Sequence, residues 1–383
     1  IMNIKTIFPD YTLVDTGDGE KLERFGGYTL RRPEPQAIWR KTLSEQQWQA
    51  SADASFMRDD RSEERGEWRL KPKMPSRWHI SYDYKDMHLK MRLALTSFKH
   101  VGIFPEQAAN WNFIYDTCRA KIESKGAKPK VLNLFAYTGG ATLAAAAAGA
   151  EVTHVDSVKQ VVTWSRENME SSRLDGIRWI VEDALKFVQR EVRRGNRYDG
   201  IILDPPAYGR GANGEKWVLE QNIAEMLEAC SELLADDGFL VLNLYSMGLS
   251  STIARTLVHQ MFGEPVKEEF GELYFSDRAG KELPFAEMVK YNDVSYMLNN
   301  AKNFGFAFDV GTEVRLLNNH LIISAALTDF GFITWKTDNL ISAAVDGNFG
   351  FNGVNLATQD IEFEQDFEFV ATRPTAEDKY NTQ

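Results

Sequence analysis

The sequence predicts an α/β fold with a doubly wound, Rossmann-like sheet at the centre of the chain. Residues 129–250 alternate between apolar strands and helical segments, which is typical of a parallel sheet covered on both faces. The strands end in glycine, acidic or proline-containing loops, and a doubly wound sheet binds ligands at that edge. We expect strands at 130–135, 151–155, 177–181, 200–204 and 238–244, and helices at about 140–148, 157–173, 184–194 and 217–235.

Length and composition predict several globular domains. The chain has 383 residues, of which 43% are hydrophobic and 26% charged. Alternating apolar residues in Phe304–Leu316 and Leu321–Leu327 predict a β-hairpin near the C-terminus. We expect a small β-rich accessory domain at 1–85, a linker and helix at 86–128, the central α/β domain at 129–290, and an acidic β-rich extension at 291–383.

The charge is unevenly distributed. The chain carries a net charge of −11, which argues against a generally basic nucleic-acid binder. Residues 291–383 hold 5 Lys or Arg and 13 Asp or Glu, hence −8, which leaves about −3 for the rest. A local basic surface is compatible with that balance. The densely charged segment Arg58–Lys73 is either a solvated loop or a surface that faces RNA.

Other sequence features point to a cytoplasmic protein without a bound metal. We find no apolar run near the ~20 residues that span a bilayer, and no export signal at the N-terminus. The two cysteines, Cys118 and Cys230, predict neither a disulfide framework nor a metal cluster.

A loop of small and polar residues follows the first central strand. Its sequence is Phe135-Ala136-Tyr137-Thr138-Gly139-Gly140. The two glycines allow the backbone to approach a ligand, and the next helix presents free N–H groups to an anionic group such as a cofactor carboxylate. The alternative is a tight turn with no ligand.

Acidic residues follow the next two strands. Asp156 ends the second strand, where its carboxylate can accept both hydroxyl groups of a ribose. Asp183 follows the third strand and can receive the amino group of an adenine. Either carboxylate could instead cap the helices that begin near Ser157 and Ala184. The preceding glycine loop favours the ribose role for Asp156.

Asp204-Pro205-Pro206-Ala207-Tyr208 is the most specific motif in the chain. Two prolines cannot continue strand pairing, and they give a rigid loop with fixed φ. Such a loop can present Asp204 to a planar, flipped-out nitrogenous group on which Tyr208 stacks. The alternative is a simple strand stop. The following segment, Gly209–Trp217, is either a lid that contacts phosphate through its cations or only a glycine-rich loop.

These motifs resemble those of class I S-adenosylmethionine-dependent methyltransferases. More narrowly, they resemble the bacterial family that includes the 23S ribosomal RNA cytosine-C5 methyltransferase, over about residues 80–290. The resemblance implies S-adenosyl-L-methionine as cofactor and RNA, with ribosomal RNA favoured, as substrate. It places Val155-Asp156-Ser157 and Glu182-Asp183-Ala184 in cofactor-contacting segments. Gly102–Gln107 matches a family segment that lies against the cofactor, which implies Phe104, Glu106 and Gln107 as its neighbours.

The chain departs from this family in its cysteines and in its N-terminal region, which does not resemble the compact RNA-binding module of the ribosomal enzyme. Cytosine-C5 methylation needs a cysteine nucleophile, and neither cysteine follows the Asp-Pro-Pro strand or the fifth strand. We therefore expect transfer to a base nitrogen, with Asp204 and Tyr208 facing the acceptor. A protein side chain or a small molecule is the alternative acceptor. A nucleotide-binding dehydrogenase is a distant third, because the Gly-x-Gly-x-x-Gly fingerprint is absent.

Overall fold

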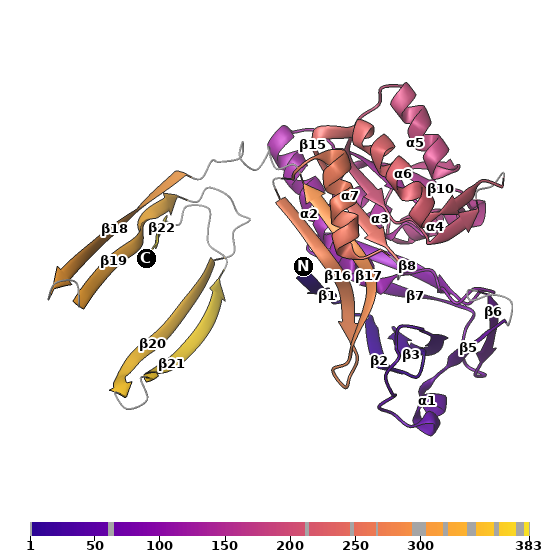
Figure 1. Cartoon of the computed structure of the whole chain (residues 1–383). Helices are drawn as coiled ribbons and strands as arrows, with labels where there is room; N and C mark the ends of the chain where they lie inside the picture. Colours follow the sequence, from indigo (N-terminus) through magenta and orange to yellow (C-terminus); the bar gives the residue numbers. More distant parts are fainter. Residues whose placement is uncertain are drawn as a thin grey trace. The chain divides into compact units, whose positions relative to one another are not determined.

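The chain folds into two compact units, which are described separately. The computed structural model describes residues 2–59, 65–210, 214–245, 249–265 and 267–292, and then 304–316, 321–334, 342–355, 360–372 and 379–382. The first unit spans residues 1–296 and the second spans residues 297–383 (Figure 1).

An eight-stranded sheet forms the centre of the first unit, with the strand order β1-β16-β17-β15-β12-β9-β10-β11. The five strands from β15 to β11 run parallel, as the sequence predicts, and β17 is antiparallel to both of its neighbours. The strands are β1 (Met2–Lys5), β9 (Lys130–Leu134), β10 (Glu151–Asp156), β11 (Arg178–Val181), β12 (Tyr198–Leu203), β15 (Leu234–Leu244), β16 (Lys267–Ser276) and β17 (Glu282–Asn292).

Helices cover both faces of this sheet because successive strand residues point to opposite sides. Val131, Ile202 and Val241 belong to one buried cluster, together with side chains of α2 and α3. Their neighbours Leu132, Leu203 and Leu242 belong to a second cluster, with side chains of α5, α6 and α7. The helices are η1 (Pro105–Gln107), α2 (Ala108–Lys125), α3 (Gly140–Ala147), α4 (Lys159–Ser171), α5 (Ala184–Arg193), α6 (Leu219–Leu233) and α7 (Ser251–Phe262).

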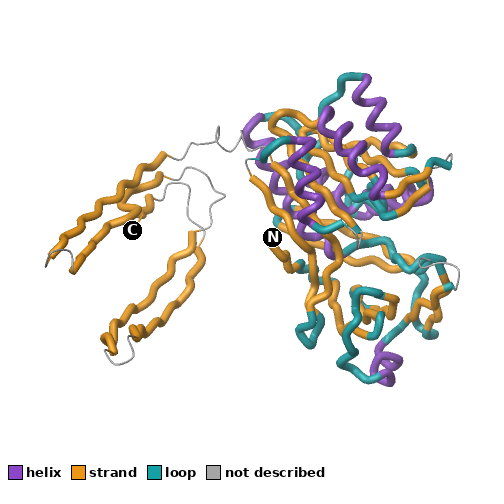
Figure 2. Tube along the Cα trace, viewed as in Figure 1, coloured by secondary structure: helices purple, strands orange, loops and turns teal. Residues whose placement is uncertain are grey.

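The N-terminal region is β-rich, as predicted. Its five-stranded sheet has the order β2-β3-β4-β5-β6 and carries a short helix that Ser44 caps through a capping box. Figure 2 shows these strands and the helix gathered at one end of the unit, apart from the helices that flank the central sheet. The elements are β2 (Tyr11–Gly17), β3 (Glu20–Phe25), β4 (Tyr28–Pro33), α1 (Glu45–Ser51), β5 (Ala54–Arg58) and β6 (Gly66–Leu70).

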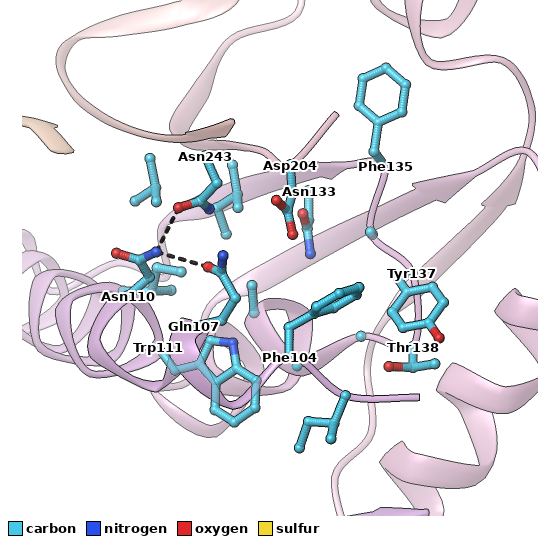
Figure 3. Close-up of a pocket in the computed structure, with 18 of the residues that line it drawn as sticks. Phe104, Gln107, Asn110, Trp111, Asn133, Phe135, Tyr137, Thr138, Asp204 and Asn243 are labelled. Atoms are coloured by element: carbon cyan, nitrogen blue, oxygen red, sulfur yellow. Dashed lines mark hydrogen bonds between the residues drawn. The ribbon is translucent and has the colours of Figure 1, made fainter. Parts of the chain in front are cut away.

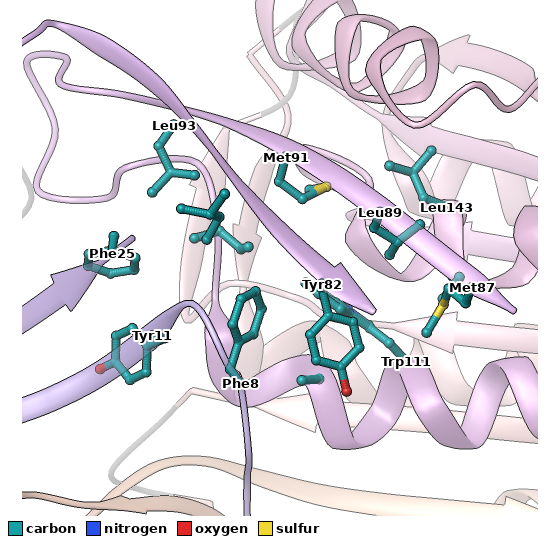
Figure 4. Close-up of a cluster of buried hydrophobic side chains, with 14 of the residues drawn as sticks. Phe8, Tyr11, Phe25, Tyr82, Met87, Leu89, Met91, Leu93, Trp111 and Leu143 are labelled. Carbon is teal, nitrogen blue, oxygen red and sulfur yellow. The ribbon is translucent and has the colours of Figure 1, made fainter. Parts of the chain in front are cut away.

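A two-stranded hairpin joins this region to the central domain. It consists of β7 (Arg77–Tyr84) and β8 (Met87–Ala94). The inward side chains of β8, among them Leu89, Met91 and Leu93, point into a cluster shared with Phe8 and Trp111 (Figure 4). One apolar core therefore runs from the accessory strands to the central helices.

Within residues 86–128, the alternation of Leu89, Met91, Leu93 and Leu95 predicts a strand or an irregular lead-in, and Met87–Ala94 forms strand β8. The structure differs from the sequence-based expectations at two places. Met2–Lys5 pairs with β16 and so extends the central sheet rather than an accessory domain. The helix expected at 217–235 ends at Leu233, and Leu234 already begins β15 because it pairs with Tyr198 of β12.

The second unit contains only strands in its described residues. Strands β18 (Phe304–Leu316) and β19 (Leu321–Thr334) form the predicted antiparallel hairpin, and β22 (Lys379–Thr382) adds to β19. Strands β20 (Ser342–Asn355) and β21 (Asp360–Thr372) form a second hairpin.

Candidate active site

A pocket lies where the loops after β9 and β12 meet. These neighbouring parallel strands lie at the topological switch point of the sheet, where ligands bind in doubly wound folds. The hollow has a volume of about 490 Å³, which includes space open to the solvent. Of the predicted site residues, nine line it: Phe104, Gln107, Phe135, Ala136, Tyr137, Thr138, Gly139, Gly140 and Asp204 (Figure 3).

The glycine loop has a strained and closely packed backbone. Phe135 and Tyr137 adopt the left-handed conformation, with φ of 54° and 47°, and Gly139 has φ of 89°. Non-glycine residues rarely adopt such angles, and they gather at functional sites. A Cβ atom on Gly140 would lie 2.3 Å from the ring of Trp111. The glycine therefore lets the start of α3 pack against that ring.

Side chains beneath the loop hold this conformation. Ser165 of α4 donates a hydrogen bond to the Tyr137 carbonyl (2.6 Å), and Asn168 donates one to the Thr138 carbonyl (2.9 Å). The Thr138 hydroxyl donates in turn to the Gly102 carbonyl (2.7 Å). The loop is thereby tied both to α4 and to the segment before η1.

His154 supports the same loop from the buried strand β10. Its ring nitrogens lie 2.9 Å from the Thr142 hydroxyl and 3.4 Å from the Ser165 hydroxyl. Burial lowers the pKa of His154 to about 3, so the imidazole is neutral at physiological pH. His154 is therefore a neutral, hydrogen-bonded histidine of the core.

Asp156 ends β10 beside the glycine loop and is not among the residues that line the pocket. One carboxylate oxygen accepts the Tyr137 N–H (3.0 Å) and the other accepts the Val158 N–H (2.9 Å). Burial raises the pKa of Asp156. Ser157 follows at a half-buried position. Each carboxylate oxygen can accept a second hydrogen bond, so the ribose role for Asp156 stays a prediction.

Asp183 follows β11 and lies farther along the same edge of the sheet. It caps α5 by accepting the Lys186 N–H (3.0 Å), which is the alternative role considered from the sequence. Ala184 is buried in the first turn of that helix. Neither residue lines the pocket, and the adenine role of Asp183 stays a prediction.

Asp204, the residue directly after β12, brings an unsatisfied acceptor to the pocket. Its Oδ1 atom is buried and has no hydrogen-bond partner among the described residues. Burial and the negative charge of Glu106 together raise the pKa of Asp204 to about 8. In Figure 3, Asp204 and Asn133 point into the same space as Gln107 and Phe104. A polar ligand could satisfy this oxygen.

Glu106 lies behind the pocket rather than in its lining. The residue is 2% exposed, and its backbone carbonyl accepts the Thr6 hydroxyl. Burial raises the pKa of Glu106 to about 7, although the positive charge of Lys21 opposes the shift. Its negative charge affects the pocket by helping to raise the pKa of Asp204.

The residues after Asp204 form a short antiparallel ribbon. Strand β13 (Tyr208–Arg210) pairs with β14 (Lys216–Val218), and the tip at 211–213 lies outside the described residues. Trp217 donates a hydrogen bond to the Pro206 carbonyl (2.7 Å), which anchors the ribbon to the proline pair. Pro205 is buried and Pro206 exposed, while the Tyr208 ring is 52% exposed.

Several residues of the pocket escape the sequence analysis. Asn110 donates from its Nδ2 to Gln107 and to Asn243 (2.8 Å each), and Gln107 donates to the Tyr245 hydroxyl (2.6 Å). Asn243 and Asn133 lie near the ends of buried strands. A polar residue at the end of an apolar strand is a sequence pattern that could have predicted them. Trp111 gave no such signal, because it reads as an ordinary buried helix residue.

The remaining predictions concern metals, membranes and cysteines. We find no cluster of potential metal ligands among the described residues. In the same part of the chain, no helix is long and apolar enough to span a membrane. Both cysteines are fully buried, and burial raises the pKa of Cys118 to about 12 and that of Cys230 even further.

The pocket has the features that an S-adenosylmethionine site requires. The glycine loop approaches the N-terminus of α3, whose free N–H groups suit a carboxylate. Phe104 packs between the rings of Tyr137 and Tyr245, at centroid distances of 5.4 and 5.6 Å. The unpaired Asp204 and Asn133 oxygens face the same space and suit polar or cationic groups.

Comparisons with known proteins agree with this assignment. The model of a family described as "S-adenosylmethionine-dependent methyltransferase" matches residues 30–262. A family of unknown function (DUF5723) matches residues 274–383. The crystal structure of a SAM-dependent methyltransferase from Agrobacterium tumefaciens is 37% identical, covers 76% of this chain and 94% of its own, and gives a TM-score of 0.69. A putative methyltransferase in complex with SAH shares the fold, at 18% identity and a TM-score of 0.58, over 74% of this chain and 75% of its own.

The curated relatives are ribosomal RNA large subunit methyltransferases. The K/L enzyme of Shewanella frigidimarina is 31% identical over 156 residues, which is 40% of this chain and 20% of the relative. The K enzyme of Neisseria meningitidis is 28% identical over 148 residues, which is 38% of this chain and 41% of the relative. The chain thus spans about a fifth to two fifths of the length of these relatives. The long family match and the Agrobacterium structure show that the chain belongs to the S-adenosylmethionine-dependent methyltransferases.

Proposed function

We propose that this methyltransferase modifies a nitrogen atom of a base in RNA, with ribosomal RNA as the favoured substrate and the cytosol as its place of action. The observation that carries the proposal is the unpaired Asp204 oxygen at the pocket, next to a rigid proline pair. The names of the curated relatives support an RNA acceptor.

The cofactor-binding roles follow the order of the strands. We assign the methionine end of S-adenosylmethionine to Gly139 and Gly140, its ribose to Asp156 and its adenine to Asp183. Phe104, the residue before η1, and Gln107, the last residue of η1, would flank the cofactor. When bound, the cofactor supplies a methyl group on a positively charged sulfur.

Asp204 is suited to orient an acceptor nitrogen and to take its proton. Its free Oδ1 can accept a hydrogen bond from an N–H group, which directs the nitrogen lone pair into the pocket. A pKa of about 8 allows the same carboxylate to hold the proton that the methylated nitrogen loses. A nearby cationic group favours the ionised form that accepts the bond.

The positions of the other side chains agree with transfer to nitrogen. Methylation at C5 of cytosine needs a cysteine nucleophile, and the thiols of Cys118 and Cys230 are both buried and resist ionisation. The ring of Tyr208, four residues after Asp204, does not line the pocket but is exposed and offers a stacking surface for a flipped base. We assign it that role.

A second acceptor class, a protein side chain or a small molecule, is favoured by the net charge of −11. The experiment that separates the classes is transfer of a tritiated methyl group to total RNA, total protein and metabolite extract from cells that lack the gene. We expect label in RNA. Label in protein or metabolites without label in RNA would refute the proposed substrate.

The role of Asp204 needs a separate measurement. Asp204→Asn should bind S-adenosylmethionine in calorimetry but lose methyl transfer by about 100-fold or more, the range of positioned acid–base groups. Asp175→Asn, in the exposed loop between α4 and β11, is the matched control and should retain transfer. An Asp204→Asn enzyme as active as this control would exclude the assigned role.

A further inference from the structure

Positive charge is concentrated in one part of this acidic chain. Residues 65–100 contain nine Lys or Arg and three Asp or Glu, hence a net charge of +6, whereas the whole chain carries −11. These residues form β6, the β7–β8 hairpin and the segment that leads to the pocket. The contrast marks this region as the part of the protein best suited to an anionic partner.

Part of this positive charge lies on the outer face of the β7–β8 hairpin. Because β7 and β8 bury every second side chain, Arg77, His79 and Lys90 remain exposed (Figure 4 shows the buried set). His79 pairs across the strands with Arg92, and burial together with the charges of Lys90 and Arg92 lowers the pKa of His79. Arg92 is itself paired with Glu167 (2.8 Å), whereas Arg77 and Lys90 form no ion pair among the described residues. These two cations are therefore available to an anionic partner.

An exposed aromatic ring lies in the segment that follows the hairpin. Phe98 is 42% exposed, and the guanidinium of Arg65 lies 5.2 Å from its ring centroid. Two hydrogen bonds hold the backbone of this segment against β6: Gly66 N–H donates to the Ser97 carbonyl (3.1 Å), and Trp68 Nε1 donates to the Phe98 carbonyl (3.2 Å). The ring is therefore held in place on a fixed backbone.

The same segment continues into the pocket. Leu95 N–H donates to the Ser76 carbonyl next to Arg77 (3.0 Å), so the end of the hairpin lies beside residues 94–98. Farther along, the His100 ring lies 5.2 Å from the ring of Phe104, which lines the pocket. The cations, the exposed ring and the pocket are thus parts of one continuous stretch of structure.

We propose that this stretch binds a single-stranded segment of RNA next to the target base, with phosphates on Arg77 and Lys90 and a flanking base stacked on Phe98. The inference rests on the proposed function, since it supplies the substrate for the same site. A cationic surface with an exposed aromatic ring is the arrangement by which proteins bind single strands. A base must also leave its stack to enter a pocket, which a single strand permits at little cost.

Charge and stacking can be tested with separate variants. Binding of a fluorescein-labelled 20-nucleotide oligouridine is measured by anisotropy over a range of KCl concentrations, with S-adenosylmethionine affinity measured by calorimetry on every variant. For the double variant Arg77→Gln/Lys90→Gln we expect binding weakened by about fivefold or more. The slope of log Kd against log [KCl] should fall by about 1.4, since each phosphate contact on a single strand contributes about 0.7.

The matched control removes two exposed cations at the opposite edge of the central sheet. Lys128 and Lys130 lie at the amino end of β9, and the pocket lies at its carboxyl end. The double variant Lys128→Gln/Lys130→Gln therefore removes the same amount of charge, but away from the pocket. Phe98→Ala should weaken binding by about fivefold or more without changing the salt slope, because stacking releases no counterions. Ile253→Ala, at a residue that is 43% exposed on α7, is its control.

The outcomes separate this inference from the proposed function. Equal RNA affinity and salt slope in the Arg77→Gln/Lys90→Gln and Lys128→Gln/Lys130→Gln proteins would overturn the assigned surface, even if RNA still accepts label. A wild-type protein that binds no oligouridine would also overturn it. Label in protein without label in RNA would instead overturn the proposed function. Variants that keep wild-type cofactor affinity are folded, so a loss of RNA binding in them reports on the surface itself.

Discussion

Replacement of Asp204 by asparagine should stabilise the free protein, and increasingly so as the pH rises. An aspartate in an unfolded chain titrates near pH ~4. In the folded protein, burial and the charge of Glu106 raise the pKa of Asp204 to about 8. Between these two values the folded state holds a proton that the unfolded state has lost. The free energy of unfolding of the wild type therefore falls as the pH rises from about 4 to about 8.

The magnitude follows from the size of that shift. Each pKa unit corresponds to about 1.4 kcal/mol, so a shift of about four units sets a ceiling of about 5–6 kcal/mol. Asp204 is only half-buried, and the solvent near it screens its charge. The actual loss of stability is therefore smaller than this ceiling. We expect Asp204→Asn to exceed the wild type by about 2 kcal/mol at pH 8.5 and by much less at pH 5.

Urea unfolding followed by tryptophan fluorescence measures this difference. Eight of the nine tryptophans lie in residues 1–296, so the signal reports mainly on the unit that contains Asp204. Asp86→Asn is the control for the loss of a carboxylate in an exposed turn. An Asp204→Asn protein with no added stability at pH 8.5, or with an increment that does not change between pH 5 and 8.5, would refute the reasoning.

Three further predictions concern the cofactor site and the second unit. Asp156→Ala should weaken S-adenosylmethionine binding by about 5- to 150-fold in calorimetry, the cost of a lost charged hydrogen bond; unchanged affinity would exclude the ribose role. Gly140→Ala should destabilise the protein by about 1–3 kcal/mol in urea, because its Cβ meets Trp111 at 2.3 Å, whereas Gly27→Ala has open space and should be tolerated. Removal of residues 297–383 should leave cofactor affinity unchanged, and a loss of binding would assign that unit a part in the site.

Local sequence patterns predict the central strands and the loops between them well. Apolar strand segments and the Asp-Pro-Pro motif are short-range signals, and a parallel sheet necessarily brings the ends of β9 and β12 to one edge. For that reason Gly139, Gly140 and Asp204 meet at the pocket as expected from the sequence. The sequence predicts that β15 begins at residue 238, whereas it begins at Leu234. The reason is that Leu234 pairs with Tyr198, which lies far away in the chain.

The partners of the site residues depend on contacts that no local pattern encodes. Trp111 packs against Gly140, and Asn110 reaches Asn243 across 133 residues of sequence. Helical spacing places Trp111 on a buried face but does not say which loop it meets. Likewise, Asp183 suits both an adenine contact and a helix cap, and the structure reveals the cap.

The unpaired oxygens of Asp204 and Asn133 give the pocket two buried acceptors that no described residue satisfies. A buried polar atom without a partner costs about 1–3 kcal/mol, and a buried carboxylate costs more. Apolar residues of similar size would avoid this cost at both positions, and the surrounding strand residues are apolar. The amide of Asn133 has a structural role on one side, because its Nδ2 donates to the Thr142 hydroxyl (2.8 Å). Folding alone gives no reason for its free oxygen or for the Asp204 carboxylate. A ligand that fills the pocket with donors or positive charge does, and the stabilisation expected for Asp204→Asn at pH 8.5 measures the cost of the buried negative charge in the absence of that ligand.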